Sequence, residues 1–167
     1  MPRKRVSTPS SPQRSEDPNT GNDPVLALYW NYFSVARRAF EMVEEAERAT
    51  RNAKASEREV PFARYQAFLP MWLAALFTTC EGYRAIGSKR PALEAQMDEI
   101  MEPLRTVWLH TVNYHDDATQ KQGRAPFYER SAGLLQKATD LHNALIGFFH
   151  EHVVAFSKQA AGDIHKH

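Results

Sequence analysis

Apolar side chains recur at helical spacing along this chain, and that periodicity constrains the fold more than any other feature. In the first such stretch, steps of three and four residues link Leu26, Tyr29, Phe33, Ala36, Phe40 and Val43. Steps of this size place side chains on one face of an α-helix. No window alternates apolar and polar residues over five or more positions with β-branched enrichment, and no Asn-Gly or Asp-Gly pair suggests a hairpin turn. The sequence therefore predicts an all-α protein.

Prolines mark where the helices begin. Asp23 can cap a helix and Pro24 suits the first helical position, which predicts a first helix of about 25–30 residues. Pro61 predicts the start of a second helix that ends near Ile86, and Pro91 predicts the start of a third.

Two further prolines fall inside these stretches. Pro70 predicts a kink or a break in the second helix, and Pro103 predicts an interruption of the third. The last helix is expected to begin near residues 128–131 and to run for about 28 residues. Its apolar positions and those of the second helix predict the core, together with the single cysteine: Trp72, Leu76, Cys80, Leu141 and Leu145.

The length of 167 residues fits one domain. Residues 1–22 are rich in Pro, Ser and charge, so we expect a disordered polar tail there. Residues 23–160 are expected to form a four- to five-helix up-and-down bundle, and residues 161–167 a frayed C-terminal tail. Between the third and last helices, residues 113–126 have the composition of a loop.

Composition excludes several classes of function. The net charge of +1 provides no strong field for nucleic acid, and one cysteine cannot form an internal disulfide, which favours the cytoplasm. The longest apolar run, residues 68–77, is too short for a bilayer, so no membrane association is expected. No Glu-x-x-His, Cys/His cluster or Gly-rich phosphate loop occurs, so we expect no metal and no cofactor.

One pair of residues suggests chemistry. Arg105 and His110 are separated by four residues in the segment Leu-Arg-Thr-Val-Trp-Leu-His. Arg can grip a phosphate with two N–H groups, and His can transfer a proton near neutral pH. Such a pair suffices for RNA cleavage without metal. Thr106 and Glu102 are the candidate supporting residues, because each lies four positions before the next along the series 102, 106 and 110.

The position of this motif resembles that in HEPN domains (higher eukaryotes and prokaryotes nucleotide-binding). In that family of small helical bundles an Arg–His motif on a late helix precedes a polar loop and a long final helix. Here residues 104–110, 115–126 and 134–156 occupy these places, and the resemblance covers about residues 24–158. It implies a homodimer whose two motifs face one cleft, and a metal-independent endoribonuclease of a toxin or defence type.

This chain departs from the motif of active HEPN domains at one position, which leaves its function open. Active members usually carry Asn, Asp or His directly after the Arg, whereas this chain has Thr106. Other members keep the fold without activity, so a non-catalytic module that binds a partner or neutralises a toxin is the alternative. A phage or plasmid accessory protein, with a basic arm at residues 3–5 contacting nucleic acid, is a further one. In a purely structural interpretation, Arg105 pairs with Glu102 or Asp98.

Overall fold

The computed structural model describes residues 23–112 and 132–164. The predicted tail of residues 1–22, the loop at 113–126, the expected start of the last helix at 128–131 and residues 165–167 lie outside this part. Within it every regular element is a helix, which confirms the all-α class. None of the described helices is long and apolar enough to cross a membrane.

The first helical stretch begins where its capping residues predict, but its register shifts near the start. Helix α1 (Pro24–Leu28) leads directly into the π-helix η1 (Tyr29–Phe33), and α2 (Ser34–Asn52) continues from it. The extra residue of the π-turn separates the buried side chains of Leu28 and Phe33 by five positions. Leu28 is therefore the fully buried residue of α1, whereas the expected Leu26 is only partly buried.

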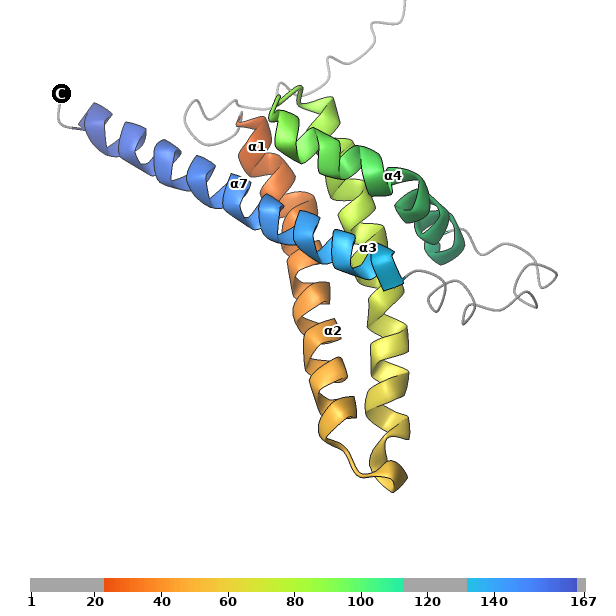
Figure 1. Cartoon of the computed structure of the whole chain (residues 1–167). Helices are drawn as coiled ribbons and strands as arrows, with labels where there is room; N and C mark the ends of the chain where they lie inside the picture. The colour runs from red at the N-terminus through yellow and green to blue at the C-terminus, as the bar shows by residue number, and fades with distance from the viewer. Residues whose placement is uncertain (1–22, 113–131, 165–167) are drawn as a thin grey trace, which may run out of the picture.

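A hairpin of two long helices forms the main axis of the molecule (Figure 1). After a short 3₁₀ turn, η2 (Ala55–Glu57), helix α3 (Glu59–Ala85) runs back along α2. Pro70 lies inside α3 without ending it, so the expected break is absent. Residues on both sides of Pro70 are buried, among them Leu69 and Trp72. The packing of these side chains offsets the loss of the one backbone hydrogen bond that proline cannot donate.

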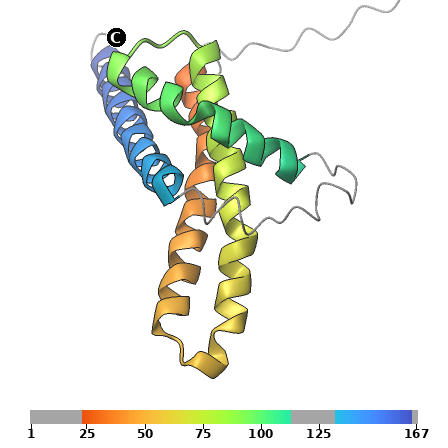
Figure 2. The ribbon, with the colours of Figure 1, turned by 45° about the vertical axis from the view of Figure 1, so that its right-hand side comes forward.

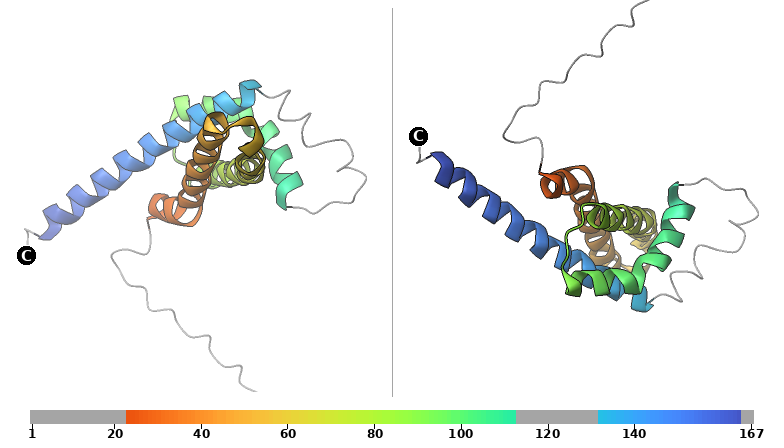
Figure 3. Two further views of the ribbon diagram at one scale, coloured as in Figure 1. Left: turned by 90° about the horizontal axis from the view of Figure 1, so that it is seen from below. Right: turned by 90° about the horizontal axis from the view of Figure 1, so that it is seen from above.

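Helix α4 (Pro91–Val112) follows a turn at Gly87, whose φ of +69° lies in the left-handed region that favours glycine. Pro103 does not divide it into two helices. Figure 3 shows α4 changing direction along its length, as expected for a helix with an internal proline.

Helix α7 (Ala132–Ile164) extends to four residues beyond the expected end of the bundle at residue 160. It lies obliquely across the upper half of the α2–α3 hairpin, and its C-terminal part extends past the other helices (Figures 1 and 2). The turn end of the hairpin projects away from α4 and α7 in both views.

The core lies where α7 and α4 pack against the upper part of the hairpin. All five residues expected in the core are buried there: Trp72, Leu76, Cys80, Leu141 and Leu145. Within residues 23–112 and 132–164, every long helical stretch contributes further large side chains that are fully buried: Phe33, Leu73, Tyr83, Met97, Ile100, Leu104, His142 and Phe149. One apolar cluster thus joins the first, second, third and last helices.

Candidate functional site

The motif segment of α4 has one buried face and one exposed face. Leu104 and Val107 are buried, whereas the side chain of Arg105 between them is 61% exposed. Trp108 packs against Phe77 of α3, with ring centroids 5.6 Å apart. These contacts fix the orientation of the helix and hold Arg105 at the surface.

Glu102 contacts both Arg105 and Thr106, which follow it within about one turn of α4. Arg105 Nη1 is 3.9 Å from Glu102 Oε2, and Thr106 Oγ1 donates a hydrogen bond to the main-chain oxygen of Glu102 at 3.1 Å. The ion pair is highly exposed, and such pairs contribute about 0–1 kcal/mol. Asp98, the other partner considered for Arg105, instead pairs with Arg84 of α3.

His110 lies five positions beyond Arg105 in the same helix, and its side chain lies outside the described part of the structure. Five helical steps correspond to a rotation of about 140° around the helix axis. The backbone therefore does not place Arg105 and His110 on the same face of α4. Thr106 and His110, four positions apart, share a face.

A second histidine, which the sequence pattern did not single out, is fully buried in the core. The ring of His142 on α7 lies among Phe33, Phe40 and Trp72, with centroid distances of 5.2, 4.5 and 6.0 Å. Its Nδ1 accepts a hydrogen bond from Trp72 Nε1 at 3.3 Å, while its Nε2 has no partner among the described residues. Burial, with a smaller effect of the nearby Arg37, lowers the pKa of His142 to about 4.

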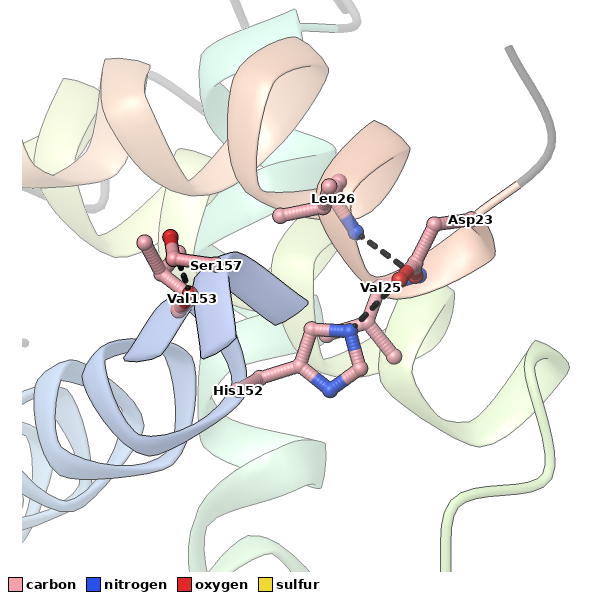
Figure 4. A network of polar contacts seen from close by, with 6 residues as sticks. All are labelled: Asp23, Val25, Leu26, His152, Val153 and Ser157. Atoms are coloured by element: carbon pink, nitrogen blue, oxygen red, sulfur yellow. Dashed lines mark hydrogen bonds and ion pairs between the residues drawn. The ribbon is translucent and has the colours of Figure 1, made fainter. Parts of the chain in front are cut away.

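A third histidine joins α7 to the start of α1 (Figure 4). His152 Nε2 is 2.7 Å from Oδ2 of Asp23, while Oδ1 of Asp23 accepts hydrogen bonds from the backbone N–H groups of Val25 and Leu26. Partial burial raises the pKa of Asp23, but the hydrogen bonds from His152 and from the backbone outweigh it, so the pKa is lowered overall. Asp23 is thus both the helix cap and the partner of His152.

Two shallow grooves border α7. One lies against the start of α4 and is lined by Arg90, Leu93, Gln96 and Phe148, with the Arg90 guanidinium 4.9 Å from the Phe148 ring centroid. The other lies against η1 and is lined mainly by aromatic and aliphatic side chains, together with Arg37 and His150: Tyr29, Phe33, Arg37, Ile146, Phe149, His150 and Val153. Neither groove is lined by Arg105.

The described residues contain no group of three or more His, Cys, Asp or Glu side chains that could hold a metal ion. Cys80 is fully buried, and burial raises the pKa of its thiol to about 12. A thiol with this pKa is a poor nucleophile because the thiolate is the reactive form. Cys80 is therefore a core residue in this structure.

Comparisons with family models, curated proteins and solved structures found no match to this chain. A function therefore has to be inferred from the helical fold and the arrangement of its side chains.

Proposed function

We propose that this chain is a HEPN-like helical protein that cleaves RNA without a metal ion. In this proposal Arg105 binds the scissile phosphate and His110 acts as the general acid or base. The observation that carries the proposal is Arg105 itself, a guanidinium held at the surface by a helix whose opposite face is buried. A guanidinium placed in this way can bind a phosphate through two N–H groups.

The neighbouring side chains are compatible with this role. The exposed Glu102 carboxylate interacts only weakly with Arg105, so a phosphate can replace it at little cost. The Thr106 hydroxyl donates its hydrogen to the Glu102 carbonyl. Its oxygen can still accept a hydrogen bond from a ribose or from His110.

The rotation of about 140° between positions 105 and 110 favours an active unit of two chains. In a homodimer with a two-fold axis, each site can take its guanidinium from one α4 and its imidazole from the other. We propose such a dimer, acting on RNA in the cytoplasm, as the active form.

RNA cleavage by the full chain in EDTA tests the proposal. The expected product carries a 2′,3′-cyclic phosphate, because the neighbouring 2′-OH attacks the phosphorus, and DNA is not cleaved. His110→Ala should lower the rate by about 10²–10⁴-fold, the usual share of general acid–base catalysis. Arg105→Ala should lower it by about 10²–10³-fold through lost charge stabilisation.

Arg38→Ala is the matched control. Arg38 is also an exposed arginine that pairs with a glutamate three positions away, Glu41, at 3.1 Å. Its replacement should leave cleavage unchanged. Cleavage that persists at full rate in Arg105→Ala, or that falls equally in Arg38→Ala, would contradict the assigned role.

A second candidate function is a non-catalytic module that binds a protein partner. The groove between η1 and α7 favours it, since its apolar side chains Ile146 and Val153 are 38% and 39% exposed. Trp30 in η1 is 68% exposed. Wild-type protein that is inert on RNA, together with partner binding that Ile146→Asp abolishes, would favour this alternative.

A further inference from the structure

The ring of His142 is packed at the point where α7 crosses the α2–α3 hairpin. The ring lies on aromatic side chains from each neighbouring element: Phe33 of η1, Phe40 of α2 and Trp72 of α3. It is fully buried, so water does not reach it from the surface. An ionisable side chain at this crossing is therefore enclosed by apolar groups.

The hydrogen bond with Trp72 requires the neutral form of this ring. An indole N–H can only donate, so Nδ1 must accept, and the hydrogen of the neutral imidazole then lies on Nε2. Protonation adds a hydrogen to Nδ1 and turns the contact into two donors that face each other. The imidazolium would then hold two buried N–H groups without an acceptor among the described residues, since Nε2 already has none.

The surrounding charges do not compensate for protonation. On α2, Arg37 and Glu41 act on His142 in opposite directions and pair with each other at 3.4 Å, both about half exposed. The groups that pack against the ring from η1 and α3, Phe33 and Trp72, carry no charge. A positive charge on His142 is thus relieved only if the ring leaves its place.

We propose that His142 is an acid-sensitive latch: the neutral ring fastens α7 to the α2–α3 hairpin, and protonation releases α7. Release would expose the apolar side chains of α7 that now face the core, including Leu141 and Leu145. This inference does not depend on the proposed cleavage of RNA.

A second polar contact joins α7 to the first helical stretch, away from the His142 ring: His152 Nε2 lies 2.7 Å from Asp23 Oδ2. Despite partial burial, the pKa of Asp23 is lowered by its hydrogen bonds, so its carboxylate stays charged above pH 4.5. Among the described residues, two other ion pairs hold α7, Lys137–Glu99 and Arg90–Glu151, but both are about half exposed and such pairs contribute little. Replacement of His142 should therefore remove most of the acid response.

The expected response follows from linkage. In the docked state the pKa of His142 is about 4, whereas a released histidine has its ordinary pKa of about 6.5. Between these values, the equilibrium constant for release should rise about tenfold for each unit by which the pH falls.

Hydrogen–deuterium exchange of the full chain between pH 7.5 and 4.5, corrected for the intrinsic exchange rate, tests the latch. For amides of α7 around residues 134–149, the equilibrium constant for opening should rise about tenfold for each pH unit below 6.5. For amides of α2 and α3 the rise should be smaller. His142→Phe and His142→Leu, two variants that cannot titrate, should remove most of the response. His150→Gln, a change at an exposed α7 histidine, should leave it intact.

Two variants at position 142 are used because one of them could fail to fold. Circular dichroism shows whether each variant is folded. A flat wild-type profile would overturn the latch. An equally steep profile in a folded His142 variant would also overturn it, as would equal exchange in α7 and in the hairpin, because that pattern describes global unfolding.

Discussion

At the junction of α2, α3 and α7 the ionisable side chain of His142 is fully buried, whereas on α4 the side chain of Arg105 is 61% exposed. The two regions place polar groups in opposite environments. Among the described residues His142 has one hydrogen bond, to Trp72, and its aromatic neighbours come from η1, α2 and α3. Arg105 has one weak ion pair, and its loss affects little of the fold.

This difference separates stability from function. Burial makes the free energy of unfolding sensitive to the charge of His142, since a charged group without a partner is costly to bury. The guanidinium of Arg105 is largely exposed, so a ligand can reach it. Substitutions in the two regions should therefore change different measurements. Stability measurements on variants of both regions test that separation, and the largest change is expected in the core.

Leu145→Ala should reduce the free energy of unfolding by about 2–5 kcal/mol, because it leaves a cavity at a fully buried position of the junction. Urea denaturation at pH 7.5 measures the change. The neighbouring Ile146 is 38% exposed, so Ile146→Ala should cost clearly less. Equal costs for the two variants would mean that the junction is not packed as described.

Lowering the pH should destabilise the protein through His142. The folded state has a pKa of about 4 at this residue and the unfolded chain about 6.5, so the unfolded chain binds more protons between these values. Stability from this group is therefore present above pH 6.5 and is lost as the pH falls towards 4, by about 3 kcal/mol in all.

The pH effect is measured by urea denaturation at several pH values, with His142→Phe as the comparison. The variant should lose less stability over the same range. A wild-type profile that stays level from pH 7 to 4.5 would contradict the buried, neutral state of His142.

Asp23→Ala should cost about 0.5–2 kcal/mol, because the carboxylate both caps α1 and contacts His152. Asp23→Asn is the matched variant, since it retains the capping oxygen and loses only the charge. Its cost should be smaller. If the two substitutions cost the same, the charge rather than the cap is what matters at this position.

Arg105→Ala should change the free energy of unfolding by no more than about 0.5 kcal/mol, the usual range for surface positions away from special features. Thermal melting followed by circular dichroism measures it. A loss of several degrees would make Arg105 a structural residue and would weaken the proposed separation of stability and function.

The helical periods were sufficient to predict the fold class and much of the core. Trp72, Leu76, Leu141 and Leu145 were all expected to be buried, and Asp23 with Pro24 marked the first helix correctly. Local rules were less successful at the internal prolines. Pro70 and Pro103 do not divide their helices, because packing on neighbouring residues outweighs the local cost.

The role of His142 depends on distant contacts that periodicity does not report. Its position has a visible signal, since Ala138, His142, Leu145 and Phe149 follow one another in steps of four and three. The polar side chain obscured that signal. Its hydrogen-bond partner, Trp72, lies 70 positions away, and only the crossing of α7 over α3 brings the two together.

At the candidate site, sequence reasoning found the residues but not whether they lie close together. Sequence reasoning identified Arg105 and considered its pairing with Glu102, and the structure contains that pair. The catalytic partnership with His110 stays a prediction, because five helical steps separate the two positions around α4. A motif read along one chain does not reveal whether its residues meet within that chain or between two copies.

The π-turn at Tyr29–Phe33 acts as a phase shift between the two ends of the first helical stretch. Each residue of a helix advances the rotation by about 100°, so removing one residue from this turn would rotate α1 against α2 by that amount. Leu28 would then leave its close approach to Gly82, and Asp23 would turn away from His152. One inserted residue thus sets the angular alignment between the chain's first cap and its last helix.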